Sequence, residues 1–202
     1  MSNERPWLVH YPAGVPSQID VREYASVPAV LEEAFGRFRD RPAFSNFGRQ
    51  LSYGQIDEMS RHFAGYLTGE LKLVKGDRIA IMMPNVLQYP IALYGALRAG
   101  LVVVNTNPLY PARELKHQLE DAGAKAIVVL DNFAATVQQV VAETHVQHIV
   151  TTVLGDMLGP KGILINFVLK HIKKMVPAFR LPHAVRFRDT LARGAAHPLS
   201  TV

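Results

Sequence analysis

The sequence predicts an α/β fold with a mostly parallel sheet and crossover helices. From Lys75 onward, short apolar runs alternate with longer stretches in which apolar residues recur every three or four positions. The runs are apolar on both faces, which is typical of strands covered by helices on each side. Gly100 and Gly123 end two of the helical stretches. This alternation predicts parallel pairing with right-handed crossovers.

Three elements are expected before the parallel sheet. Residues 1–25 are rich in Pro, Gly, Tyr and Trp without periodicity, which predicts an extended arm. Residues 43–51 predict two short strands around a turn at 46–49, that is, a short hairpin. Between arm and hairpin a helix is expected, with Ser26 as its N-cap. Its apolar stripe contains Val30, Leu31, Ala34, Phe35 and Phe38.

The next helix has a strong start signal at residues 51–56. Ser52 and Gln55 have the spacing of a capping box, in which each side chain accepts a hydrogen bond from a backbone N–H that lacks a helical partner. Leu51 and Ile56 occupy the flanking positions of a hydrophobic staple. One face then carries apolar residues at helical spacing and is expected to pack on the sheet. These residues are Ile56, Met59, Phe63 and Leu67.

The parallel sheet is expected to use strands at 78–83, 101–104, 126–130 and 148–153, joined by helices at 86–97, 112–122 and 132–142. Residues 79–104 contain a single charged residue, Arg98, and could be mistaken for a membrane span. However, Pro84, Asn85, Gln88 and Pro90 interrupt the run. A spanning helix needs about 20 mostly apolar residues without a break, so a strand, a helix and a second strand are predicted instead.

Composition places the chain among globular proteins of ordinary domain size. It has 202 residues, of which 49% are hydrophobic, and it contains no cysteine. A sizeable core is therefore possible, and disulfides and thiolate chemistry are excluded. The absence of cysteine fits a cytoplasmic protein. The first residues lack a basic segment followed by an apolar one, so no secretory signal is predicted.

Positive charge is concentrated near the C-terminal end of the sequence. Residues 157–188 contain seven Lys and Arg residues and no Asp or Glu. Because the whole chain has a net charge of +5, the remaining residues sum to −2. Within this segment, residues 162–176 predict an amphipathic helix with Leu164, Ile165, Val168, Leu169, Ile172, Met175 and Val176 on one arc. Lys170, Lys173 and Lys174 fall opposite, while Phe167 lies on the polar side.

Two interpretations of this basic helix remain open. It could lie at an anionic membrane surface, with its lysines near the lipid headgroups. It could equally pack on the rest of the protein with its lysines in solvent. No nucleic acid partner is predicted, because the segment lacks known base-reading motifs.

The sequence contains none of the common catalytic motifs. There is no G-x-G-x-x-G, no phosphate-binding G-x-x-x-x-G-K-[ST], no G-x-S-x-G and no H-E-x-x-H. His145 and His148 lie at the start of a predicted strand instead of on one face of a helix, so no metal site is expected there. His117 lies with Glu120 and Asp121 on the polar face of a predicted helix. No residue is therefore predicted to be catalytic, cofactor-binding or metal-binding.

Six short patterns occur in order within residues 51–130, and together they resemble one family. They are S-Y-x-x-I, K-G-D-R-I-A-I, M-P-N, L-R-A-G-x-V-V-V, N-P-x-Y and E-L-x-x-x-L-x-D-A-G-A. In this combination the chain resembles the amino-terminal part of adenylate-forming acyl-CoA synthetases, and within them the bacterial long-chain fatty acid–CoA ligases. One departure is Pro111-Ala112, where many relatives have a capping Thr-Pro or Ser-Pro.

The resemblance implies an activity for the full-length enzyme. A fatty acid carboxylate attacks the α-phosphate of ATP, with Mg²⁺ assisting, and CoA then displaces AMP from the acyl-adenylate. The family's phosphate loop and catalytic-lysine domain have no counterpart in these 202 residues. We therefore expect a truncated amino-terminal domain that is inactive alone and binds no cofactor tightly. The open alternatives are a medium-chain or aryl acyl-CoA ligase fragment and a non-catalytic interaction module.

The resemblance also implies a location and an organisation. It implies a cytoplasmic protein peripherally associated with the inner face of the membrane, and a homodimer contact through the arm at 1–25. The α/β subdomain is expected at 26–154, and the basic helix with a tail at 155–202. Asn105, Asn107 and Tyr110 follow a predicted strand, and ligands gather at strand carboxyl ends, so they are expected to form a cleft wall. The expected membrane-facing residues are Phe167, Lys170, Lys173 and Lys174.

Overall fold

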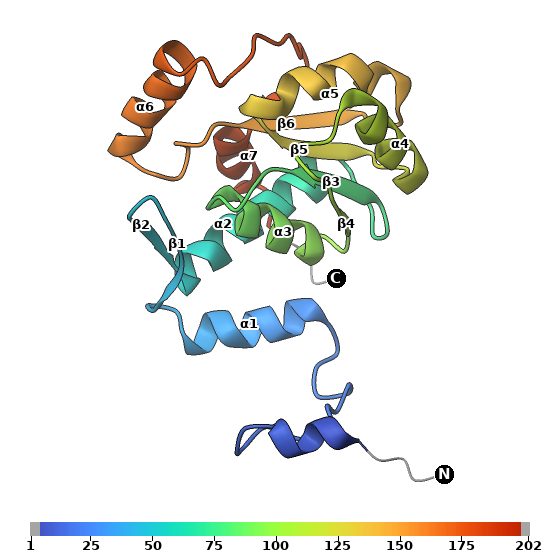
Figure 1. Ribbon diagram of the computed structural model, residues 1–202, viewed down its shortest axis with the longest axis vertical. Helices are drawn as coiled ribbons and strands as arrows, with labels where there is room; N and C mark the ends of the chain where they lie inside the picture. Colours follow the sequence, from blue (N-terminus) through green and yellow to red (C-terminus); the bar gives the residue numbers. More distant parts are fainter. Residues whose placement is uncertain (1–4, 199–202) are drawn as a thin grey trace.

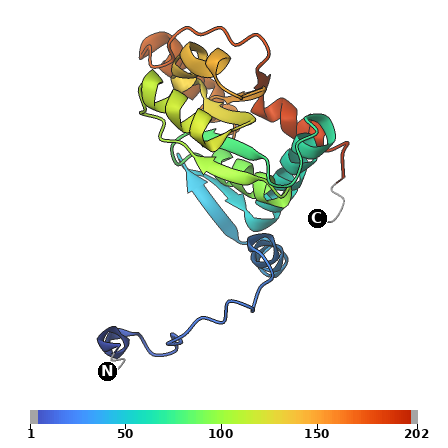
Figure 2. The same ribbon diagram turned by 90° about the vertical axis from the view of Figure 1, so that its right-hand side faces the viewer.

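The computed structural model describes residues 5–198, so positions 1–4 of the predicted arm and 199–202 of the predicted tail lie outside the described residues. It confirms an α/β fold with a parallel sheet, a hairpin and covering helices. The body has three layers, with helices on both faces of the sheet (Figure 1). The arm extends away from this body (Figure 2).

The N-terminal elements follow the predicted order. The arm contains one short 3-10 helix, η1 (Pro6–His10). Helix α1 (Val27–Arg37) begins where the Ser26 side chain accepts a hydrogen bond from the backbone N–H of Ala29. Strands β1 (Pro42–Asn46) and β2 (Arg49–Ser52) pair antiparallel. The turn residues Phe47 and Gly48 both have positive φ, 46° and 75°, which suits a two-residue hairpin turn.

Helix α2 (Tyr53–Gly65) begins with the predicted capping box. Both reciprocal hydrogen bonds between Ser52 and Gln55 are present. The helix continues into one π turn, η2 (Tyr66–Glu70). The predicted stripe is confirmed, since Ile56, Phe63 and Leu67 are fully buried and Met59 is half-buried.

The central sheet has the strand order β4-β3-β5-β6-β7, and every neighbouring pair is parallel. Its strands are β3 (Arg78–Met82), β4 (Val102–Asn105), β5 (Ala126–Leu130), β6 (His148–Thr152) and β7 (Val185–Arg186). Four match the predicted runs within one or two residues. The two-residue β7 was not predicted, because so short a run has no periodicity of its own.

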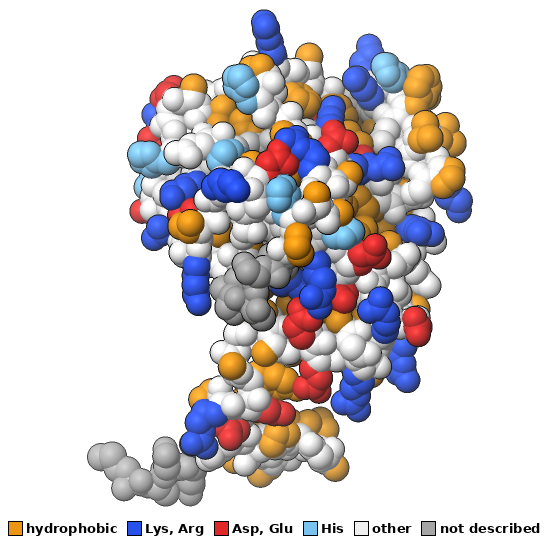
Figure 3. Space-filling model, turned by 180° about the vertical axis from the view of Figure 1, so that it is seen from behind, with side chains coloured by type: hydrophobic (Ala, Val, Ile, Leu, Met, Phe, Trp, Pro, Cys, Tyr) orange, Lys and Arg blue, Asp and Glu red, His pale blue; other side chains and the backbone are white. Residues whose placement is uncertain are grey.

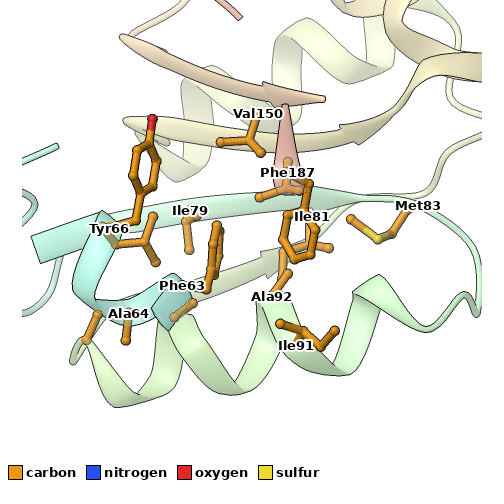
Figure 4. Packing of buried hydrophobic residues seen from close by; sticks show 14 of the residues in the cluster. Phe63, Ala64, Tyr66, Ile79, Ile81, Met83, Ile91, Ala92, Val150 and Phe187 are labelled. Atoms are coloured by element: carbon orange, nitrogen blue, oxygen red, sulfur yellow. The ribbon is translucent and has the colours of Figure 1, made fainter. Parts of the chain in front are cut away.

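Alternate residues of the strands face two separate cores. Ile79 and Ile81 of β3 belong to the larger core with residues of α2, α3 (Gln88–Arg98) and α7 (Phe187–Gly194) (Figure 4). Ala80 and Met82 belong to the second core with residues of α4 (Ala112–Ala122) and α5 (Ala134–Val140). The predicted helix at 132–142 is thus a short α-helix, flanked by 3-10 turns at Asp131–Phe133 and Val141–Glu143.

The segment after residue 154 contributes to the body. Phe187 of α7 is fully buried, and its ring centroid lies 5.1 Å from that of Phe63 in α2. Helix α6 (Pro160–Phe167) continues as one π turn, η5 (Val168–Ile172). The helix predicted at 162–176 therefore starts and ends earlier. Within residues 5–198, none of the helices has the length and apolar character needed to cross a bilayer.

Candidate functional site

The strand order reverses at β3, which identifies one edge of the sheet as the candidate site. The chain runs from β3 to β4 on one side and then crosses to β5 on the other. Helices α3 and α4, which make these two crossovers, contribute to opposite cores. In open α/β sheets such a reversal leaves a crevice at the strand carboxyl ends, where ligands bind.

An ion pair between a buried carboxylate and a half-exposed guanidinium ties three of these strand ends together. Asp131 directly follows β5 and is 4% exposed. Arg186 Nη1 of β7 lies 2.9 Å and 2.7 Å from its two carboxylate oxygens, and 3.2 Å from Thr151 Oγ1 of β6. The Arg186 side chain is 52% exposed. The pair therefore fixes the short edge strand β7 while one side of the guanidinium reaches solvent.

Burial raises the pKa of Asp131 above its usual value, although the hydrogen bonds and charge of Arg186 act to lower it. The charge of Asp156 adds to the increase. The folded state consequently holds the Asp131 proton to a higher pH than the unfolded chain does. Ionised Asp131 depends on Arg186 for compensation at neutral pH.

A cavity of about 520 Å³ opens beside this ion pair, bounded by the carboxyl ends of β5 and β6 and by α6 with η5. Residues 176–179 supply much of its apolar wall. Its polar lining comes from Asp131, Asn132, Asn166, Lys170, His171 and Arg186. Two of the lining residues are a lysine or an arginine. Arg186 is paired with Asp131, whereas Lys170 forms no ion pair with another described residue. The cavity can thus hold an anionic group beside an apolar body.

A second polar contact closes the same edge of the sheet on the α3 side. Gln88, which is 1% exposed, donates from Nε2 to Thr152 Oγ1 at 3.1 Å and to the Val153 carbonyl at 2.8 Å. Thr152 in turn donates to Asp156 at 2.7 Å. Gln88 Oε1 is buried and accepts no hydrogen bond from the described residues. This chain of hydrogen bonds holds the start of α3 against the end of β6.

The three predicted cleft-wall residues lie at the carboxyl end of β4, away from this cavity. Asn105 Oδ1 accepts a hydrogen bond from the Tyr89 hydroxyl at 2.9 Å. Asn107 Oδ1 accepts one from the backbone N–H of Leu109 at 3.0 Å, which stabilises the turn. Tyr110 lines an open hollow of about 710 Å³ against α4. The structure thus brings them to the predicted edge of the sheet but not to the lining of the cavity beside Asp131. Their role as a cleft wall stays a prediction.

The four predicted membrane-facing residues lie on the solvent side of α6, on η5 and just after it. Phe167 is 54% exposed. Lys170, Lys173 and Lys174 are exposed as well. Lys170 also reaches the rim of the cavity. Membrane contact by these residues stays a prediction.

The residues that build the cavity were not predicted from the sequence. Asp131 carries a usable signal, because it directly follows the all-apolar strand 126–130 and strand carboxyl ends are where α/β proteins bind ligands. Arg186 carries no comparable signal. No group of three or more His, Asp or Glu side chains within residues 5–198 has the arrangement of a metal site.

Comparison with known proteins identifies the family. A protein-family model described as AMP-binding enzyme matches residues 31–176. This range covers most of the chain, including every strand from β1 to β6. The chain belongs to the AMP-binding enzyme family.

Individual relatives agree with this family. The chain is 53% identical to a long-chain-fatty-acid–CoA ligase from Yersinia pestis, over 95% of the chain and 34% of the relative. It is 51% identical to the enzyme of the same name from Escherichia coli O157:H7, with the same coverage. The chain thus spans about a third of the length of these relatives. The crystal structure of the anthranilate CoA ligase AuaEII with anthranoyl-AMP has a TM-score of 0.69 at 15% identity, and 89% of this chain covers 30% of it. That likeness shows the fold alone.

In this member of the family, Arg186→Ala is expected to lower the free energy of unfolding by about 1–2 kcal/mol at pH 7, because it leaves Asp131 buried without its cation. The loss should be smaller near pH 4. A raised carboxyl pKa means that stability is highest below the unfolded-state value and falls as pH rises through the folded-state pKa. Without Arg186, the pKa of Asp131 in the folded protein would rise further, so the stability of the variant would keep falling up to a higher pH. Urea denaturation at both pH values measures the difference.

The double variant Arg186→Ala/Asp131→Asn is the control for this expectation. It should lose less stability at pH 7 than Arg186→Ala alone, because no buried carboxylate remains to be compensated. Equal losses for Arg186→Ala at both pH values would show that packing, rather than the ion pair, is responsible.

Proposed function

We propose that this chain forms part of a long-chain fatty acid–CoA ligase. The observation that supports the proposal is the 53% identity to the Yersinia pestis ligase, which extends over 95% of the chain. In the proposed reaction a fatty acid carboxylate attacks the α-phosphate of ATP, forming an acyl-adenylate and releasing pyrophosphate. The CoA thiolate then attacks the acyl carbon and displaces AMP.

The described residues are proposed to support this reaction as a scaffold. Neither a glycine-rich phosphate loop nor a metal-ligand cluster occurs within residues 5–198, so no step at the ATP phosphates or at Mg²⁺ is assigned to them. Their contribution is the parallel sheet and the polar carboxyl edge between Gln88 and Arg186. Hydrogen bonds from Gln88 to Thr152 and Val153, and from Arg186 to Asp131, hold this edge in place.

Two further properties belong to the same proposal. The exposed apolar side chains of the arm, among them Trp7, Val9 and Ile19, are proposed to contact a second subunit in a homodimer. The enzyme is proposed to be cytoplasmic and peripherally associated with the membrane. Both properties are separable from the chemistry, since a monomeric, unbound enzyme would still release pyrophosphate.

Pyrophosphate release from ATP and oleate tests the proposed activity. The 202-residue chain alone is expected to release none. A chimera in which this chain replaces its counterpart in the Yersinia pestis ligase is expected to restore release. It should prefer oleate to octanoate and benzoate, which represent the medium-chain and aryl alternatives. A folded chimera without oleate-dependent release, or turnover by the 202-residue chain alone, would contradict the proposal.

A further inference from the structure

Helix α6 and its extension η5 carry apolar side chains on two opposite sides. The inward side is identified by Gly162, which is buried against the backbone of Gly155. A Cβ at position 162 would overlap with the Gly155 carbonyl group. Asn166 Oδ1 accepts a hydrogen bond from the Gly155 N–H at 2.8 Å. Ile165 packs against the larger core, and Leu169 lines the cavity beside Asp131. The inward side is therefore already supplied with apolar contacts.

The outward side is apolar as well. Ile163 is 76% exposed, Leu164 66% and Phe167 54%. Ile172, the last residue of η5, is 63% exposed, and Met175, three residues later, is 55% exposed. We call these five side chains the apolar ridge. In Figure 3, orange side chains gather over α6 at the upper right of the molecule. Packing on the described residues uses only the inward side of α6, so it does not account for this outward apolar surface.

Lysines surround the apolar ridge. Lys161, Lys170, Lys173 and Lys174 are all exposed. None forms an ion pair with another described residue. The nearby carboxylates are used internally: Asp131 binds Arg186, and Asp156 accepts from Thr152 and from the Val153 N–H. The surface around the ridge is consequently positive.

We propose that the apolar ridge docks on an anionic lipid bilayer, with α6 lying in the plane of the membrane surface. Burying the exposed Ile, Leu and Phe side chains between the headgroups and the acyl chains is favourable, and the flexible lysines around them can contact phosphate headgroups. A second copy of the chain would bring two positive surfaces together, which disfavours that occupant. The inference specifies the membrane association proposed above and does not depend on ligase activity.

The location of the ridge links this docking to the cavity. Leu169 and Lys170 line the cavity from the same helical segment whose other side carries Phe167. Docking on the ridge would therefore hold the cavity at the membrane surface, with α6 and η5 between the two. A soluble polyanion would satisfy the lysines but leave the five apolar side chains in water.

Co-sedimentation of the 202-residue chain with vesicles tests the charge contribution. Binding is expected to phosphatidylcholine vesicles that contain phosphatidylglycerol, to weaken with salt, and to be weak on phosphatidylcholine alone. The variant Lys170→Gln/Lys173→Gln/Lys174→Asn should bind at least tenfold more weakly. Asn is used at Lys174 because this residue has φ of 50°. The matched control is Lys72→Asn/Lys75→Gln/Arg113→Gln, which removes three exposed charges elsewhere, including Lys72 with φ of 57°.

Insertion of the ridge is tested separately. Ile163→Ser/Leu164→Ser/Phe167→Ser should reduce vesicle binding at least tenfold, whereas Val74→Ser/Val102→Ser/Leu109→Ser, at similarly exposed positions, should not. In the variant Trp7→Phe/Phe167→Trp the single tryptophan reports on the ridge, and its emission should shift to shorter wavelength on the anionic vesicles. This substitution is conservative, so it remains informative if the serine variant fails to fold.

Three results would overturn the inference. The first is no preference for anionic vesicles, and the second is equal loss in ridge and control variants. The third is equal binding to the soluble polyanion heparin with no emission shift on vesicles, which would indicate an anionic macromolecule instead of a bilayer. Failure of oleate activation by the chimera with intact vesicle binding would overturn the proposed reaction and leave the membrane surface standing.

Discussion

Replacing Arg98 by leucine is expected to lower the free energy of unfolding by about 3–5 kcal/mol, because it breaks a buried ion pair. The Arg98 side chain on α3 is 3% exposed. It lies 2.6 Å from the Asp57 carboxylate and 2.8 Å from the Asp57 carbonyl oxygen in α2. It also lies 2.8 Å from Glu32 of α1 and covers the ring of Phe35 at 5.0 Å. One guanidinium thus joins three helices.

Urea denaturation measures this loss, with Arg61→Leu as the control. Arg61 binds the same Asp57, at 2.9 Å, but its side chain is 49% exposed, so about 1 kcal/mol or less is expected from its removal. Adding Asp57→Asn to Arg98→Leu should restore part of the stability. A loss from Arg98→Leu no larger than that from Arg61→Leu would contradict the role given to the buried pair.

The same pair gives an expected pH dependence. Burial acts to raise the pKa of Asp57, but hydrogen bonds from Arg98 and Arg61 outweigh it and hold the pKa below its usual value. A lowered carboxyl pKa contributes stability above the unfolded-state value of about 3.9, and this is lost as pH falls through the folded-state pKa. The difference between wild type and Arg98→Leu should therefore narrow below about pH 4.

Gly194→Ala is expected to lower the free energy of unfolding by about 2–3 kcal/mol, although alanine is the better helix former. Gly194 is the last residue of α7, and a Cβ there would clash with the carbonyl oxygen of His62 in α2. The clashing atoms are backbone atoms of α2 and its continuation, so no side-chain rotation can relieve the overlap. The substitution should therefore push α7 away from α2.

Gly36→Ala is the matched control. Gly36 lies near the end of α1, is exposed, and a Cβ there would meet no atom within 4 Å. It should raise the free energy of unfolding by about 0.5–1 kcal/mol. Thermal or urea denaturation of both variants compares the signs. Stabilisation by both substitutions would show that helix propensity, and not the contact between α7 and α2, determines the outcome at position 194.

The elements that sequence reasoning predicts well are those with local signals. The capping box joins Ser52 and Gln55, which are three residues apart, so its hydrogen bonds depend only on the local sequence. Strands 78–83 and 126–130 are recognisable because both of their faces are buried. The turn at Phe47 and Gly48 is likewise specified by adjacent residues.

The elements that were missed depend on distant parts of the chain. β7 exists because Val185 and Arg186 pair with Val150 and Thr151 of β6. The orientation of α6 is set by the contact between Gly162 and Gly155, which a helical wheel does not contain. The wheel placed Leu164 on the apolar arc and Phe167 on the polar side, whereas both are exposed. The site at Asp131 needed the position of Arg186, which lies 55 residues later.

The position of Phe187 in the larger core has a consequence for folding during synthesis. Chains emerge from the ribosome N-terminus first, at about 5–20 residues per second. Four of the five strands and the helices α2 to α5 all precede residue 153, yet Phe63 and its neighbours on that face of the sheet remain partly uncovered until α7 has been made. A nascent chain that has reached residue 153 would expose this hydrophobic surface for several seconds, until α7 is synthesised. It is in that interval that chaperones or premature self-association would compete with native packing.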